Sequence, residues 1–225
     1  MPGLLVLVMI VIVAGGAFVL WCSRSRQRTK ELATWAVTKG LSFRAARDRG
    51  FAGRFLSLSC LHRGRSRYAC NIAEGDWNGR GVKTFDYHFV SGHGKNRSSH
   101  TFSAILLNSN VTLKPLYIRP ERGLDKNTGF IDLDDVDFES AEFSREFDVK
   151  SVDPQWAHDV IHQQTMEFLL RMPRFSIEFD HAHVIVWNHR PFEPGTFETA
   201  IAVAQGLLDN LSEYRSRHPR MRSHP

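Results

Sequence analysis

The chain has 225 residues, of which 42% are hydrophobic and 24% charged, and its formal net charge is +5. These proportions are those of one ordinary globular domain and exclude a chain that is mainly disordered. Three cysteines are too few, and odd in number, for a disulfide scaffold.

The N-terminus contains the longest apolar run. No charged side chain occurs between Gly3 and Cys22, and about 20 apolar residues are enough for a helix to cross a bilayer. We therefore predict a transmembrane helix over residues 3–22, with the lipid bilayer as its partner. Two alternatives stay open, a signal peptide cleaved after Ala17 and a lipoprotein modified at Cys22. Both fit less well, because no basic residue precedes the run and the bulky Trp21 precedes Cys22.

Residues 23–54 form a basic juxtamembrane segment, in which a helix is expected over residues 27–39, ended by Gly40. Positive charge beside a membrane span favours the cytoplasmic side. The expected location is the inner cell membrane, crossed once, with the C-terminal domain in the cytoplasm. The same charges attract anionic lipid. The predicted membrane-surface residues are Arg24, Arg26, Arg28 and Lys30.

Residues 55–214 are predicted to form a soluble α+β domain. In the segment 82–90, Phe85 and Tyr87 alternate with Asp86 and His88, the pattern of a half-buried strand. Short turns between strands predict a largely antiparallel sheet with two or three packed helices. Strands are expected at residues 55–61, 68–73, 82–90, 101–107, 113–118, 175–179 and 184–187, with short strands or extended loops at 131–138 and 143–149.

Two helices are expected to close this domain. Asp153 followed by Pro154 predicts the start of one long helix that continues to Met172. Pro194 predicts the start of the last helix, whose apolar face ends at Leu211. Residues 215–225 contain four arginines and no acid, which predicts a solvent-exposed basic tail that could dock on lipid or on the acidic segment 132–137.

His158 and His162 are the candidate metal ligands. Histidines four residues apart lie on one face of a helix and can share a metal ion. Asp159 stands where zinc peptidases have a glutamate as general base, and no third ligand has a diagnostic spacing. The alternative interpretation is two polar residues on an amphipathic helix.

The other patterns exclude several functions. An EF-hand loop starting at Asp132 would have Asp137 in place of its glycine and Phe143 in place of its glutamate. Segment 75–81 lacks the Lys-Ser/Thr of a phosphate loop, and the chain has no G-x-S-x-G motif. No nucleic-acid-binding motif accompanies the positive charge. We predict no cofactor and no nucleic-acid partner. His88, His93 and His100 are expected to be surface residues around one hairpin.

Several segments together resemble a family of bacterial single-pass membrane-anchored proteins of unknown function. They are the N-terminal apolar run, the segments 85–89, 116–121 and 137–147, Trp156-Ala157 and the segment 184–187. The resemblance covers about residues 55–211. It implies a bacterial, membrane-anchored protein and carries over no catalytic residue.

These observations favour a non-enzymatic protein whose cytoplasmic domain binds a partner protein or the membrane surface. A metal-dependent hydrolase that uses His158 and His162 is the rival hypothesis. A sensor of anionic lipid is a third.

Overall fold

The computed structural model describes residues 23–121 and 133–217, together with Met9. None of the helices in this part of the chain combines the length and the apolar composition needed to span a bilayer. The predicted fold class, which opens with a transmembrane helix, is therefore corrected. The predicted span itself, residues 3–22, lies outside the described residues apart from Met9.

A large sheet organises the fold. It contains nine strands in the order β1-β2-β3-β4-β9-β8-β5-β7-β6, and every strand pair in it is antiparallel. The strands are β1 (Ser42–Arg44), β2 (Arg65–Trp77), β3 (Arg80–Ser91), β4 (Ser98–Asn108), β5 (Leu116–Pro120), β6 (Asp134–Asp135), β7 (Phe147–Ser151), β8 (Ser176–Phe179) and β9 (His183–Asn188).

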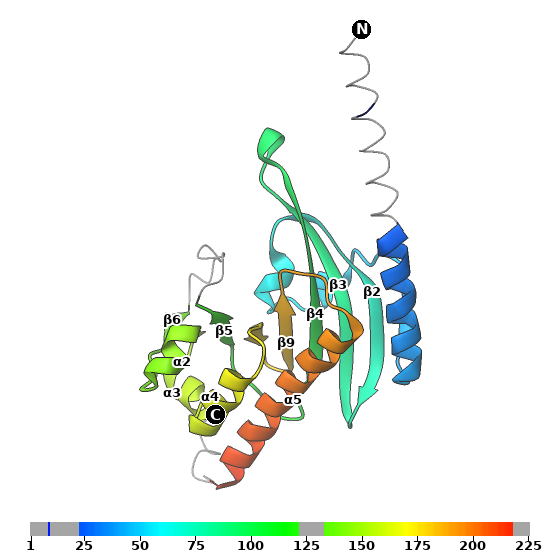
Figure 1. The fold of residues 1–225 in the computed structure, drawn as a ribbon. Helices are drawn as coiled ribbons and strands as arrows, with labels where there is room; N and C mark the ends of the chain where they lie inside the picture. Colours follow the sequence, from blue (N-terminus) through cyan, green and yellow to red (C-terminus); the bar gives the residue numbers. More distant parts are fainter. Residues whose placement is uncertain (1–8, 10–22, 122–132, 218–225) are drawn as a thin grey trace.

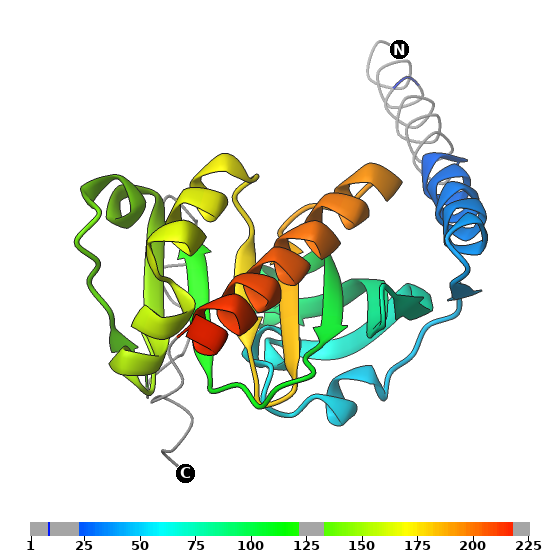
Figure 2. The same cartoon turned by 90° about the horizontal axis from the view of Figure 1, so that it is seen from below.

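Helices cover one face of this sheet (Figures 1 and 2). Residues 23–38 form a helix beside β2, and α5 (Pro194–Arg217) lies across β4 and β9. The shorter α2 (Ala141–Glu146), α3 (Pro154–Val160) and α4 (Gln163–Arg171) gather near β7 and α5. Because α5 reaches Arg217, the first residues of the predicted tail are helical, and residues 218–225 lie outside the described part.

The two faces of the sheet divide the core by the period of two that strands impose. Ile105, Val184 and Val186 join the cluster under the helices. Ala104, Ile185 and Trp187 join a second cluster on the opposite face. Two short 3₁₀ helices cover that second face, η1 (Phe51–Arg54) and η2 (Ser59–His62). A third, η3 (Gly94–Asn96), lies at the tip of the β3–β4 hairpin.

Three predicted elements are wrong. Residues 143–146, predicted as a short strand or extended loop, belong to the helix α2, which begins after Ser140, whose side chain accepts the N–H of Phe143. Residues 55–61 are not a strand, because the backbone N–H groups of Ser59 and Cys60 donate to the side chain of Glu178 rather than to a neighbouring strand. The long helix predicted from Pro154 to Met172 is two helices, α3 and α4. The break falls at Ile161 and His162, and His162 has the extended backbone (φ −75°, ψ 173°) of a residue that precedes a helix.

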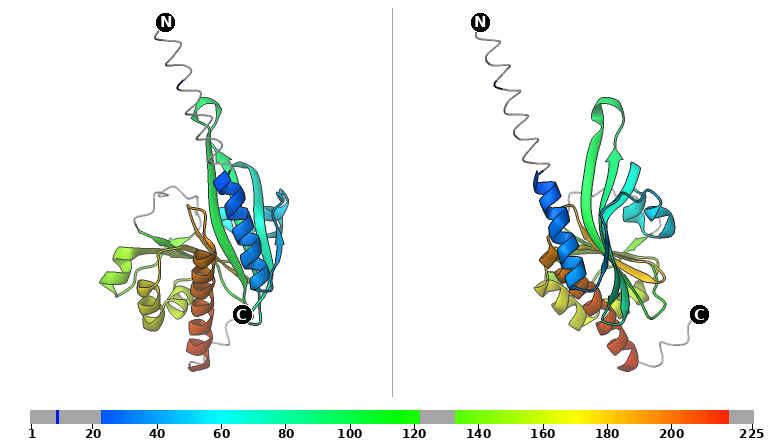
Figure 3. Two further views of the ribbon diagram at one scale, coloured as in Figure 1. Left: turned by 45° about the vertical axis from the view of Figure 1, so that its right-hand side comes forward. Right: turned by 90° about the vertical axis from the view of Figure 1, so that its right-hand side faces the viewer.

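The β3–β4 hairpin is the most prominent projection of the fold. Its strands pair continuously from Val82 with Leu107 to Ser91 with Ser98. Figure 3 shows that its tip extends beyond the rest of the sheet, at the end of the molecule where the described part of the N-terminal helix begins. Residues 92–100 at this tip are all exposed.

Candidate functional site

The N-terminal helix is packed onto the sheet by a stripe of apolar side chains. Leu32, Trp35 and Ala36 are buried in the cluster under the helices, as their spacing predicts. Gly40 ends the helix with a φ of +72°, and its N–H donates to the carbonyl of Val37 at 3.0 Å. The N–H of Leu41 donates to the carbonyl of Ala36 at 2.8 Å, so the end is a Schellman motif, and Gly40 is confirmed as the terminating residue.

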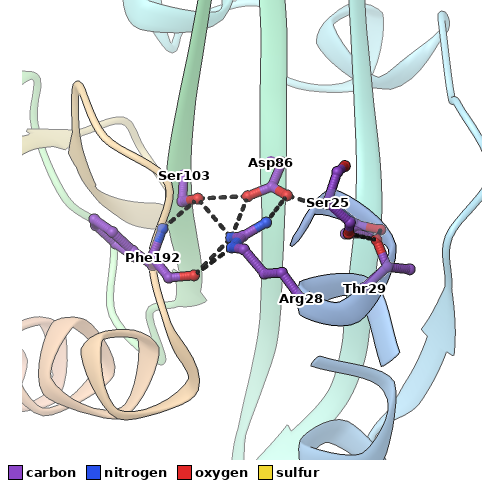
Figure 4. A network of polar contacts seen from close by, with 7 residues as sticks. Ser25, Arg28, Thr29, Asp86, Ser103 and Phe192 are labelled. Carbon is purple, nitrogen blue, oxygen red and sulfur yellow. Dashed lines mark hydrogen bonds and ion pairs between the residues drawn. The ribbon is translucent and has the colours of Figure 1, made fainter. Parts of the chain in front are cut away.

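A buried ion pair between Arg28 and Asp86 holds the first turns of the same helix against the sheet (Figure 4). Nη1 and Nη2 of Arg28 donate to the two carboxylate oxygens of Asp86 at 2.6 and 2.9 Å. Nε and Nη2 of Arg28 also donate to the carbonyl of Phe192, at 3.1 and 2.6 Å. One side chain of the helix therefore connects to β3 and to the segment that leads into α5.

The carboxylate of Asp86 accepts hydrogen bonds from several neighbouring side chains. Asn71 donates to it from β2 at 2.8 Å, and the hydroxyl of Ser103 donates from β4. The oxygen of Ser103 in turn accepts the N–H of Phe192 at 2.8 Å. With two bonds from Arg28, the carboxylate accepts four hydrogen bonds, which is its full capacity.

Burial and charge act in opposite directions at this pair. The side chains of Arg28 and Asp86 are 17% and 5% exposed. Burial alone would favour a neutral guanidinium, but the hydrogen bonds and the charge of Asp86 outweigh burial and raise the pKa of Arg28 above its ordinary value. Arg28 was predicted to bind the membrane surface. Its position does not support that role, because its guanidinium is paired with the carboxylate of Asp86 inside the protein.

One side of the N-terminal helix, from Gln27 to Lys39, borders a shallow groove of about 520 Å³. At its floor, Nε1 of Trp35 donates to Oε1 of Glu198 in α5 at 2.9 Å, and Lys39 lies 3.0 Å from the same oxygen. The hydrogen bonds from Trp35 and then Lys39 lower the pKa of Glu198. The groove is lined by Gln27, Lys30, Glu31, Thr34, Trp35, Thr38, Lys39 and Glu198.

A second buried carboxylate holds the opposite face. Glu178 in β8 is 4% exposed, and its Oε1 accepts the N–H of Ser59 at 2.6 Å. Its Oε2 accepts the hydroxyl of Ser59 at 3.1 Å and the N–H of Cys60 at 3.3 Å. Burial raises the pKa of Glu178 even though these bonds favour the charged form. Asp86 and Glu178 thus each fasten a segment distant in sequence to one face of the sheet.

The other predicted membrane-surface residues are exposed to solvent. Arg24, Arg26 and Lys30 are exposed on the N-terminal helix, and none of them forms an ion pair with a described residue. Lys30 faces the groove, whereas Arg24 and Arg26 lie in the first turns that the structure describes.

The two predicted metal ligands do not lie on one helix, because α3 ends at Val160. The ring of His158 packs edge-on against Phe138, with 4.9 Å between centroids. The ring of His162 stacks on Tyr214 at 4.7 Å. Across the part of the chain that the structure describes, no three His, Cys, Asp or Glu side chains are grouped so that they could hold a metal ion.

The basic residues that gather around the β3–β4 hairpin are not among the predicted site residues. Arg65 and Arg67 begin β2, opposite the last residues of β3, and Lys95 and Arg97 stand at the exposed tip. His88 stacks on Tyr68 and His100 on Phe89, with centroids 4.7 and 4.8 Å apart. A signal was present in the residues: the chain has no Asp or Glu between positions 49 and 73 or between positions 87 and 120.

Comparison with known proteins shows that the chain shares its fold with a solved structure. No family model matches the chain, and no curated protein matches it. Among solved structures, the chain is similar to that of the mycobacterial trehalose monomycolate transport factor A, with a TM-score of 0.65 and 13% sequence identity. The match covers 83% of this chain and 95% of that chain, so it includes nearly the whole of the neighbour. The expected cytoplasmic location and the resemblance to a bacterial family stay predictions.

Proposed function

We propose that this chain is a non-catalytic accessory protein in the transport of a lipid conjugate. The observation that carries the proposal is the fold shared with a trehalose monomycolate transport factor over 95% of that protein. A match of this extent covers most of both chains rather than one small substructure.

The hydrogen bonds of the two buried carboxylates, Asp86 and Glu178, support a binding role rather than a catalytic one. Asp86 accepts its full set of hydrogen bonds from Arg28, Asn71 and Ser103. Glu178 accepts from the backbone and hydroxyl of residues 59 and 60. A general acid or base has to face substrate within hydrogen-bonding reach, whereas these two carboxylates hold elements of the fold together.

The experiment is a depletion of the protein in the cells that encode it, with newly made trehalose glycolipid labelled by a fluorescent trehalose analogue. We expect total labelled glycolipid to stay constant while the fraction at the cell surface falls several-fold. An enzyme of glycolipid synthesis would lower the total instead. An unchanged surface fraction would contradict a role in transport.

Complementation separates this proposal from the metal-dependent hydrolase. The variant His158→Gln/His162→Gln should restore the surface fraction, because the structure gives both rings packing roles. Loss of rescue by a variant that still accumulates to the level of the unaltered protein would favour metal-dependent chemistry.

A further inference from the structure

The β3–β4 hairpin and the start of β2 form a projecting basic surface. We call it the hairpin end, made of Arg65, Arg67, His93, Lys95, Arg97 and His100. Its tip, residues 92–100, is wholly exposed and consists of Gly, Ser, Asn, His, Lys and Arg with no acidic or large apolar side chain. The surface is therefore polar and positive, and nothing in it would insert into hydrocarbon.

The charges of the hairpin end are not neutralised within the described part of the protein. Arg65, Lys95 and Arg97 form no ion pair with any described residue. Some basic residues elsewhere are paired: Arg44 and Arg54 with Asp48, Arg80 with Asp209, Lys114 with Asp153, Lys150 with Asp135 and Arg174 with Glu146. Others, such as Arg145 and Arg171, form no ion pair with a described residue. The hairpin end differs from these positions in having no acidic residue in its own segment, since the chain has no Asp or Glu between positions 87 and 120.

His88, a titratable group beside the hairpin end, responds to the positive charge around it. Partial burial lowers the pKa of His88, and the positive charges of Arg47, His100 and Arg97 lower it further. Arg47 also lies over the ring of Tyr68 at 4.6 Å. Several basic side chains therefore lie close enough to one another to oppose the protonation of a histidine between them.

A second element presents positive charge at the same end. Arg24 and Arg26 are exposed at the beginning of the described helix, and Figures 1 and 3 place this beginning on the side toward which the hairpin projects. The acidic residues of β6 and the segment before α2 lie at the other edge of the sheet: Asp134, Asp135, Asp137 and Glu139. The charge is therefore separated along the molecule, and such a distribution orients a protein in an external field.

The shape of the hairpin end selects the kind of partner. Single-stranded nucleic acid is bound by open aromatic rings on which bases stack, but here His88 covers Tyr68 and His100 covers Phe89. A projecting tip with flanking arginines is suited to a broad negative surface that several elements touch together. Juxtaposed Lys and Arg residues are attracted to anionic lipid in this way.

We propose that the hairpin end docks on a bilayer that contains anionic lipid, by charge and without insertion. Arg24 and Arg26 contribute to the same contact. This interaction does not depend on the transport role proposed above, because it would position the molecule at a membrane whatever it binds there.

The test uses the full-length chain and two kinds of vesicle, one of phosphatidylcholine alone and one with about a third phosphatidylglycerol. The measured quantity is the ratio of the two partition coefficients. Residues 3–22 are present in every variant and meet both vesicles, so the ratio cancels whatever they contribute. We expect Lys95→Ala/Arg97→Ala to lower the ratio about thirtyfold, since each charge contributes about fivefold, equivalent to about 1 kcal/mol.

The matched control is Arg145→Ala/Arg171→Ala, which removes the same number of charges from exposed positions on α2 and α4. It should leave the ratio within about twofold of the unaltered protein, and thermal unfolding should show both variants folded. Raising the salt to about 1 M, which shortens the screening length to about 3 Å, should bring the ratio close to one.

Two results would overturn the proposal. One is an equal loss in both double variants, which would mean that net charge rather than the hairpin end sets the affinity. The other is an unchanged vesicle ratio with a large loss of affinity for a single-stranded RNA, which would assign the surface to nucleic acid. Either result would leave the transport proposal to be decided by the depletion experiment.

Discussion

Asp86 and Glu178 show how a single buried side chain determines where a distant segment lies. Each carboxylate comes from the interior of a strand, and each binds a segment that no strand pairing would hold. A buried charge without partners is costly, so the native arrangement is favoured over any arrangement in which the N-terminal helix or residues 59–60 lie elsewhere.

Arg28→Ala should therefore destabilise the protein strongly, because it leaves the carboxylate of Asp86 buried without its cation. We expect a loss of about 3 kcal/mol in the free energy of unfolding, measured with urea. Amides of residues 29–36 should also exchange hydrogen faster. The matched control is Arg26→Ala, an exposed position on the same helix, which should change stability by less than about 0.5 kcal/mol. Equal effects of the two variants would contradict the role given to the ion pair.

Glu178 gives a pH dependence whose sign follows from the direction of its shift. Burial raises its pKa in the folded protein, so the folded state binds a proton at pH values where the unfolded state has lost it. The stability that Glu178 contributes is complete below the unfolded pKa and is lost as pH rises through the folded pKa. We expect the free energy of unfolding to fall, relative to Glu178→Gln, as pH rises from about 5 to 7. A constant difference between the two proteins over this range would contradict the raised pKa.

At the scale of elements, the contact between α4 and α5 depends on one glycine. A Cβ added to Gly206 would lie 2.4 Å from Cζ of Phe168, so the residue allows the two helices to approach. The same substitution at Gly195, in the first turn of α5, would meet no atom within 4 Å.

Gly206→Ala should destabilise the protein although alanine is the better helix former. Overpacking costs about 1–3 kcal/mol and the gain in helix propensity is about 1 kcal/mol, which leaves a net loss of about 1 kcal/mol. Gly195→Ala should be neutral or stabilising. The double variant Gly206→Ala/Phe168→Leu should recover much of the loss in urea unfolding. A stabilised Gly206→Ala would show that the helices are further apart than described.

The elements that could be predicted from the sequence are those set by local pattern. The alternation of Phe85 and Tyr87 with Asp86 correctly predicts the two faces of β3, and Gly40 ends its helix as expected. The hairpin of β8 and β9 lies where its residues predict it. The turn between β2 and β3 consists of Asn78 and Gly79, both with positive φ, the signature of a two-residue hairpin turn.

The elements that could not be predicted depend on partners far away in the sequence. The alternating pattern of residues 82–90 predicts that Asp86 faces solvent. The residue is buried because the N-terminal helix, which carries Arg28, packs over that face of β3. Residues 55–61 have the apolar content of a strand, but Glu178 lies 118 positions beyond Cys60 and takes its N–H. The histidine pair required a continuous helix, but α3 ends at Val160 and His162 has the extended backbone that precedes α4.

At the scale of the whole molecule, charge is the property that distinguishes one end from the other. The hairpin end is basic and projects from the sheet (Figure 3), while Asp134, Asp135, Asp137 and Glu139 lie at the β6 edge of the sheet or beside it. A protein with this distribution should approach an anionic surface in one orientation. That orientation leaves α5 and the groove beside Trp35 accessible to a protein partner.

Hydrogen exchange of the full-length chain on vesicles tests this orientation most directly. We expect vesicles that contain phosphatidylglycerol, compared with phosphatidylcholine alone, to slow exchange in residues 91–100 and 65–68 and to leave residues 141–151 unchanged. Slower exchange confined to residues 141–151, or none in the hairpin, would contradict the claim that the molecule meets a membrane with its hairpin end.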